Sequence, residues 1–405
     1  MSETRVPRGG RVRLGTVEGD LRVEPNARIE AEGTLAISGT ARFDGDAEID
    51  GDLRCGRFTS DDGTVRVHGN LTVTSELHAR DSAVEIDGQL HARHVDVDRG
   101  LRVQGPATAE EVEVGGILEG GSTLTATKVS VGGTLRLAGT LTARSVEAGG
   151  SIDVSDVALE SLEAGGLIHL KGGSVERAIE VGGRFVSDEP LSFGALEVGG
   201  VAELKQSGKG GSVEVGGVFT ARGDLAFSSL EVGGMGSIDG DATGESFEVG
   251  GKFTVGGALR LTRGLEVGGS MSVGHELTGD RLEIGGELSA RSAIFSSSAE
   301  VGGRVRTEGG LKAARLRLSR KARATGPLVG GTVEIDDRAR AEDVFGESVE
   351  VRERAEVRRV VAARVRVHSG ASVDEVTYTE SAEIDPDARL RAPPRKVDAL
   401  PPFPL

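Results

Sequence analysis

Glutamate returns at one fixed place in a repeated phrase, an apolar residue followed by Glu-Val-Gly-Gly or a close variant, about every 17 residues between 112 and 303. If successive units stack in register, these carboxylates form an outward ladder with rungs ~4.8 Å apart. Like charges directly opposite one another are destabilising, so salt, arginine or bound cations must screen them. The ladder is either a solvated face that keeps neighbouring molecules apart or a strip for cations or lateral association. Ser130 interrupts it once, and its members are Glu113, Glu147, Glu163, Glu180, Glu197, Glu214, Glu231, Glu248, Glu266, Glu283 and Glu300.

The densest group of histidines is His78, His91 and His94, with Asp96 and Asp98 close by in the sequence. A metal site needs three or four convergent ligands, and spacing along strands does not supply that convergence. We therefore expect surface positions for these residues and no metal site. The chain also lacks a Gly-x-Ser-x-Gly elbow, a Walker loop and a Cys-x-x-Cys pair, so we predict no catalytic residue and no cofactor.

Alternation of apolar and polar residues is the pattern that must position these side chains. Leu230 and Val232 flank Glu231, and a period of two is typical of a strand. The Gly-Gly pair ends that strand, and we expect it to supply the positive φ of a sharp corner. A unit of this size holds about three short strands and buries its apolar side only by stacking on its neighbours. The sequence therefore predicts an all-β fold, a single-stranded parallel β-helix with about 17 residues per coil and about 22 coils.

Composition and charge narrow the class of protein. Of 405 residues, 63 are glycine and only 3% are aromatic, which favours a thin core of Val, Leu, Ile and Ala. The net charge of −16 argues against nucleic acid and anionic lipid as partners. Cys55 is the single cysteine, so no intrachain disulfide forms. Without an apolar leader or a long apolar run, the chain is expected to be cytoplasmic, with no direct membrane segment.

The regularity of the repeat divides the chain into four sections. An irregular β-helix section covers residues 1–111, because the step from Leu101 to Val112 is only 11 residues, so that either a corner is trimmed or the strand roles shift. The regular array covers 112–315, and a C-terminal β-helix section covers 316–385. Residues 386–405 are rich in proline, which cannot continue a sheet, so a flexible tail is predicted.

Several short units resemble the bactofilins, a family of polymer-forming cytoskeletal proteins. The units are Ile37–Gly39, Ala47–Leu53 and Val65–Leu71, with Gly-Asp-Leu and Gly-Asn-Leu corners. The resemblance implies a right-handed β-helix and nucleotide-independent, end-to-end assembly into filaments. The chain departs from the family in being several times longer than a typical bactofilin core.

The two ends of a β-helix carry unpaired backbone groups, which must be capped or pair with another copy. No capping helix is evident, so we predict a non-enzymatic scaffold that self-assembles as a homopolymer, with protein clients along its sides or at its proline-rich tail. A monomer whose tails fold over its ends, a surface or adhesive β-solenoid, and a polysaccharide-acting β-helix enzyme are the alternatives. The predicted polymerisation residues are Val12, Leu14, Leu21, Val23, Val365, Val367, Val373 and Val376.

Overall fold

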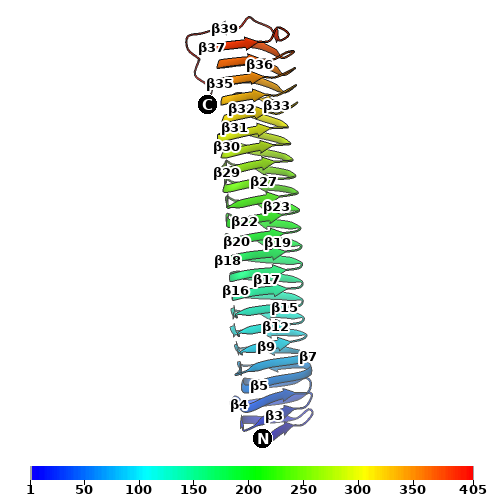
Figure 1. Cartoon of the computed structure of the whole chain (residues 1–405). Coiled ribbons are helices and arrows are strands. Elements are labelled where there is room, and N and C mark those ends of the chain that lie inside the picture. Colours follow the sequence, from blue (N-terminus) through cyan, green and yellow to red (C-terminus); the bar gives the residue numbers. More distant parts are fainter. Residues whose placement is uncertain (1, 405) are drawn as a thin grey trace. The chain divides into compact units, whose positions relative to one another are not determined.

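The computed structural model describes residues 2–404, which are built from strands and turns (Figure 1). The strands wind into a β-solenoid of about 23 turns whose equivalent residues lie about 17 positions apart. Every recorded strand pairing is parallel, as between β16 and β17 or between β31 and β32. The predicted all-β parallel β-helix is thereby confirmed, and its handedness stays a prediction.

The chain forms two compact units, Met1–Gly200 and Val201–Leu405. The strands of the first unit are β1 (Glu3–Val6), β2 (Arg11–Val17), β3 (Asp20–Val23), β4 (Ala27–Phe43), β5 (Ala47–Val67), β6 (Leu71–Val73), β7 (Glu76–Ile86), β8 (Leu90–His91), β9 (His94–Val97), β10 (Gly100–Val103), β11 (Ala107–Thr108), β12 (Glu111–Val114), β13 (Ile117–Gly120), β14 (Leu124–Thr125), β15 (Lys128–Val131), β16 (Thr134–Ala148), β17 (Ser151–Ala164), β18 (Leu167–Val181), β19 (Arg184–Ser187) and β20 (Leu191–Val198). The strands of the second unit are β21 (Val201–Leu204), β22 (Gly208–Val215), β23 (Val218–Ala221), β24 (Leu225–Ala226), β25 (Ser229–Val232), β26 (Met235–Ile238), β27 (Ala242–Val249), β28 (Lys252–Val255), β29 (Leu259–Val267), β30 (Ser270–Ile284), β31 (Glu287–Val301), β32 (Arg304–Leu318), β33 (Arg323–Thr325), β34 (Leu328–Ile335), β35 (Arg340–Val351), β36 (Glu356–Val367), β37 (Ser372–Ile384), β38 (Arg389–Leu390) and β39 (Arg395–Lys396).

Each coil has three straight segments, which define three faces of the solenoid. Face A carries the Glu-Val-Gly-Gly phrase, face B follows the glycine pair, and face C completes the coil. In the first unit, β16 and β17 pair on all three faces, through Val146 and Leu162 on face A, Leu135 and Ile152 on face B, and Leu141 and Val157 on face C. In the second unit, β31 and β32 pair in the same way.

The core is formed by the inward side chain of every second residue. Leu135, Leu141 and Val146 are at most 2% exposed, while Arg136, Thr142 and Glu147, the residues next to them, are exposed. This alternation follows from the pleat of a strand, which sends successive side chains to opposite faces. Phenylalanines also enter the core, as where Phe247 and Phe253 meet edge to face at 4.8 Å between ring centroids.

Glycine is required in these pairs for a different physical reason from the one predicted. None of the glycines in the pairs that close the repeated phrase, between 115 and 303, adopts a positive φ. The second glycine of a pair instead lies against the carbonyl of the equivalent glycine one coil earlier. A Cβ on Gly251 would lie 1.8 Å from the oxygen of Gly234, and one on Gly183 would lie 2.3 Å from the oxygen of Gly166. The prediction of a left-handed corner is therefore wrong, and the close approach of stacked backbones is what requires glycine.

The short step between Leu101 and Val112 is a change of face and not a trimmed corner. Leu101 pairs with Leu118 on face B, whereas Val112 pairs with Val95 and Val129 on face A. The two residues therefore belong to different columns, each of which keeps its own period of 17 residues. The predicted section boundaries at 111 and 315 stay predictions.

The C-terminal segment is not the flexible tail that its prolines predicted. β38 and β39 pair with β37, and the chain then turns back beside the preceding strands (Figure 1). Leu400 and Phe403 pack against Val329, Phe345 and Val361, three apolar side chains that point outward on face C. The proline argument failed because the paired stretches are only two residues long and the prolines lie outside them.

Candidate functional site

The glutamates of the repeated phrase stand in direct lateral succession on face A of each unit. In the first unit Glu147 pairs with Glu163, and the row continues through Glu180 to Glu197. In the second unit the row joins Glu214, Glu231, Glu248, Glu266, Glu283 and Glu300. Beyond Glu300 the next rung is Arg317, followed by Glu334.

The carboxylates of this row repel one another. Burial, together with the neighbouring charges of Glu231 and Glu266, raises the pKa of Glu248. Within residues 2–404 no ion pair joins these ladder glutamates to a basic side chain. Arginine enters the row only where it ends, since the Arg317 guanidinium lies 3.9 Å from the Glu334 carboxylate. Arg317 also interacts electrostatically with Glu300, so the row meets a positive charge at this end.

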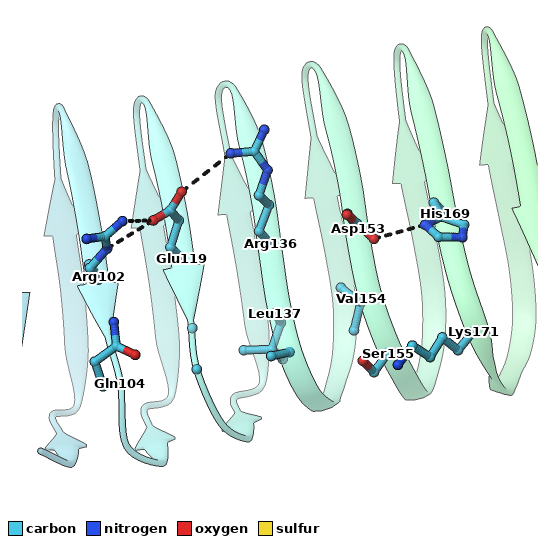
Figure 2. A pocket seen from close by; sticks show the side chains of 13 residues that line it. Arg102, Gln104, Glu119, Arg136, Leu137, Asp153, Val154, Ser155, His169 and Lys171 are labelled. Carbon is cyan, nitrogen blue, oxygen red and sulfur yellow. Dashed lines mark hydrogen bonds and ion pairs between the residues drawn. The ribbon is translucent and has the colours of Figure 1, made fainter. Parts of the chain in front are cut away.

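Face B of the first unit carries a second row, in which opposite charges alternate. Successive partners on neighbouring strands are Arg66, Glu85, Arg102, Glu119, Arg136, Asp153 and His169. Figure 2 shows its central members, with the Glu119 carboxylate between two guanidinium groups. Arg102 donates to Glu119 at 2.6 and 3.0 Å, and Arg136 donates to it at 3.4 Å. The sequence analysis missed this row, although the alternating sign at steps of about 17 residues could have indicated it.

A recess of about 410 Å³ opens beside this row (Figure 2). Gly120 and Gly121 line it, and the tip of Leu137 lies where a Cβ on Gly120 would be. Its rim carries the amide of Gln104, the hydroxyl of Ser155 and the ammonium of Lys171. The carboxylates of Glu119 and Asp153 line the recess as well, so it carries charged groups of both signs.

Glu119, which lines the recess, is poorly suited to acid catalysis. The hydrogen bond from Arg102 is the main cause that lowers the pKa of Glu119. A general acid needs a pKa near the operating pH. The pKa of Glu119 is lowered instead, so this carboxylate is ionised at neutral pH. Asp153 accepts a hydrogen bond from the ring of His169 at 3.0 Å, and the other ring nitrogen of His169 lies 3.0 Å from Asp188. The recess therefore presents charged groups, and the lowered pKa of Glu119 leaves that carboxylate without a proton to give at neutral pH.

The histidines singled out by the sequence lie on three different strands. His78 Nδ1 lies 2.8 Å from Asp96, and His94 lies 3.8 Å from Glu111. His91 lies in β8, opposite Thr72 and Thr108 on face C. Among residues 2–404 no group of three or more potential ligands is arranged to hold a metal ion.

The predicted polymerisation residues fall into two groups. Val12 and Leu14 lie in β2 and are half-buried, so they are at the open end of the first coil. The other six are core residues at most 3% exposed, because another strand already covers each of them: Leu21, Val23, Val365, Val367, Val373 and Val376. Leu21 and Val23, for instance, pair with Thr4 and Val6 of β1.

The strand edges that remain unpaired at the ends of the solenoid are therefore shorter than the sequence predicted. Within residues 2–404, β2 pairs only with β4 and β1 only with β3. At the last coil, β38 and β39 cover faces B and C of β37, but Ser381–Ile384 on face A pairs only with β36. Ala382 and Ile384, whose side chains point inward, remain half-buried there. Sequence reasoning ended the β-helix section at 385, but for the last coil it named Val373 and Val376 on faces B and C and missed these two residues on face A.

Comparisons with family models, with curated proteins and with solved structures found no match. In the part of the chain that the structure describes, no helix is long and apolar enough to cross a membrane. Any function must therefore be argued from the solenoid itself.

Proposed function

We propose that this chain is a non-enzymatic structural scaffold that assembles end to end through its terminal coils, without nucleotide or cofactor. The observation that carries the proposal is the set of unpaired strand edges, β1 and β2 at one end and Ser381–Ile384 at the other. Unpaired edges present backbone N–H and C=O groups that a further strand satisfies. The same contact would bury Val12 and Ile384, whose exposed apolar area favours association.

The similarity to bactofilins supports the same mode of assembly and a place in the cytoplasm. The ladder of glutamates supports separation of filaments, since two such faces repel each other at moderate salt. Client proteins then bind along the free sides, where the recess at Gly120 offers one polar attachment point.

Electron microscopy and sedimentation of the purified chain without nucleotide test the proposal. Filaments should lengthen as the protein concentration rises. Val12→Glu should shorten them while the circular dichroism spectrum stays that of the parent. Met235→Glu is the matched control, because Met235 is 58% exposed on the side of a coil and away from either edge. Single-chain particles at every salt and protein concentration would rule out the scaffold.

A further inference from the structure

The two ends of the solenoid carry complementary strand edges. Within residues 2–404, β38 covers face B and β39 covers face C of the last full coil, whereas Ser381–Ile384 on face A has no strand over it. At the other end, β1 lies on face A and precedes β2 on face B, and each strand pairs on one side only. The face that the last, partial coil lacks is therefore the face on which the first coil starts.

Face A of the two ends matches in register. β1 pairs with β3, and this pairing turns Thr4 and Val6 toward the core. Ala382 and Ile384 hold the same inward places in β37, as partners of core residues in β36. If β1 of a second copy continues this parallel ladder, Val6 stacks on Ile384. Thr4 then stacks on Ala382.

Face B comes into register at the same time. Leu390 follows Ile384 by six residues, and Val12 follows Val6 by six residues. Leu390 in β38 and Val12 in β2 each pair with a core residue of the neighbouring coil, so both point inward. A copy that is seated on face A therefore stacks Val12 on Leu390. Both side chains are half-buried, and the contact would remove their remaining apolar surface from water.

The corner between these two faces has the same hydrogen-bonded turn at both ends. The Ala388 N–H donates to the Asp385 carbonyl at 3.0 Å, and the Gly10 N–H donates to the Pro7 carbonyl at 2.9 Å. A turn of the same length thus directs the chain from face A to face B in both coils. The backbone of a second copy can therefore follow the coil beneath it around this corner.

The outward side chains of face A favour the contact. In this register Arg5 faces Glu383, and opposite charges on neighbouring strands stabilise their pairing. Glu383 already lies 2.7 Å from the Arg366 guanidinium on its other side. The contact would place Glu383 between two arginines, which is the arrangement found at Glu119.

The outward side chains of face B oppose the contact. In this register Arg389 faces Arg11, and like charges directly opposite each other are destabilising. Both residues are exposed, so salt weakens their repulsion. The contact of Leu390 with Val12 must outweigh this repulsion, and a change of charge at Arg389 therefore reports on the contact.

A joint between two first coils lacks this pairing of opposite charges. Residues 2–17 hold four arginines and one acidic residue, Glu3, so two such coils repel each other. Their strands would also meet antiparallel, whereas every pairing recorded within residues 2–404 is parallel, as for β1 and β36. A filament without direction needs that joint, so the ends favour a filament in which all copies point the same way.

We propose that copies join head to tail through a composite coil, in which one copy supplies β38 and β39 on faces B and C and the next copy supplies β1 on face A. This inference rests on the proposed end-to-end assembly. Residues 388–396 then belong to the joint, and β2 of the next copy stacks on β38. Two different surfaces meet in such a contact, and heterologous contacts of this kind generate open filaments unless they close into a ring.

Charge reversal across face A tests the register, with sedimentation velocity of the full chain over a range of protein concentrations. Glu383→Arg and Arg5→Glu should each raise the concentration at which the chain assembles by about threefold to tenfold. Both substitutions in one chain should restore the assembly of the parent, because opposite charges meet again in the joint. Damage that each substitution does within its own copy would add up instead of cancelling.

Glu356→Arg is the matched control for this series. It also breaks an exposed pair with arginine, since Glu356 lies 3.0 Å from the Arg340 guanidinium. Glu356 pairs with Ser372 of the following coil and is therefore away from the open edge. Its substitution should leave the assembly concentration unchanged, and the far-UV circular dichroism spectrum of every variant should stay that of the parent.

Charge reversal on face B tests whether β38 takes part in the joint. Arg389→Glu should lower the assembly concentration by about twofold to tenfold, because the new carboxylate faces Arg11. Adding Arg11→Glu should cancel this gain, because like charges face each other again. A gain at Arg389 that survives Arg11→Glu would overturn the pairing of β38 with β2.

The remaining outcomes separate this inference from the proposed function. Compensation on face A without any effect of Arg389→Glu overturns the composite coil, because the joint is then confined to face A. Assembly of the parent that ignores the changes at Glu383 and Arg5 overturns the register and leaves end-to-end assembly standing. Twofold axes between copies in electron micrographs of the filaments overturn the head-to-tail orientation alone. No assembly by the parent or by any variant overturns this inference and the proposed function together.

Discussion

Glu231 and Glu248 lie directly opposite each other on neighbouring parallel strands, and the next partner of Glu248 is Glu266. Three carboxylates thus occupy consecutive rungs, and burial together with these two neighbours raises the pKa of the central one. A glutamate whose pKa is raised by folding is stabilised in its protonated form. Its contribution to stability is therefore present at acid pH and is lost as the pH rises through the raised pKa.

Glu248→Gln should stabilise the second unit at neutral pH and low salt. The substitution removes two like-charge contacts, each worth a few tenths to about 1 kcal/mol. Hydrogen exchange of the β25 and β27 amides measures the effect locally, since repeat arrays open coil by coil. The gain should shrink at about 1 M salt, where the Debye length is ~3 Å, and at pH values below the raised pKa. An equal gain at all salt concentrations would show that charge is not its cause.

Glu119→Gln should destabilise the first unit, whereas Glu248→Gln should stabilise the second, although both substitutions make the same chemical change. Glu119 lies between Arg102 and Arg136, and its pKa is lowered chiefly by the hydrogen bond from Arg102. A lowered pKa gives stability that is present above the ordinary value and is lost as the pH falls through the folded one. We expect a loss of up to about 1 kcal/mol at neutral pH, since solvent screens these exposed pairs. Hydrogen exchange of the β10 and β13 amides would measure it, and a gain in protection would contradict the paired row.

Gly251→Ala should disrupt the stacking of coils, whereas Gly250→Ala should be tolerated. A Cβ on Gly251 would lie 1.8 Å from the carbonyl oxygen of Gly234, while the nearest atom to one on Gly250 is 3.5 Å away. Relieving the first contact requires the backbones to separate, and overpacking typically costs 1–3 kcal/mol or more. Thermal unfolding of the two variants gives the comparison. Equal melting temperatures would mean that the pair is conserved in the repeat for a reason other than close approach.

The register of the solenoid was predictable because shifting a strand by one residue would place its apolar side chains on the wrong side. A shift of one residue would turn Leu230 and Val232 outward and Glu231 inward, so the period of 17 fixes which side chains stack. The cause of the glycine pairs was not predictable. A sequence shows that a side chain is absent, but not whether conformation or lack of space requires it.

The covered C-terminal end was missed for a similar reason. Val329, Phe345 and Val361 occupy outward positions on face C, and each is at most 6% exposed because Leu400 and Phe403 of the C-terminal segment 388–404, here called the strap, pack against them. Three apolar residues at steps of 16 in an outward column are a signal of a covered patch. Recognising it requires knowing which column faces outward, and that followed only once the face of each strand was known.

Phe403→Ala should loosen the strap without unfolding the coils. The ring of Phe403 packs on Phe345, so its loss removes part of the contact that returns the segment to face C. Local opening controls proteolysis when the open form recloses faster than it is cut. A cost of one to two kcal/mol raises the open population roughly 5–30-fold, and trypsin cleavage after Arg391, Arg395 or Lys396 should accelerate by that factor. Met235→Ala should leave the cleavage rate unchanged, since Met235 lies on β26 and does not contact the strap. Cleavage of the Phe403 variant at the rate of the parent would show that backbone pairing with β37 alone holds the strap closed.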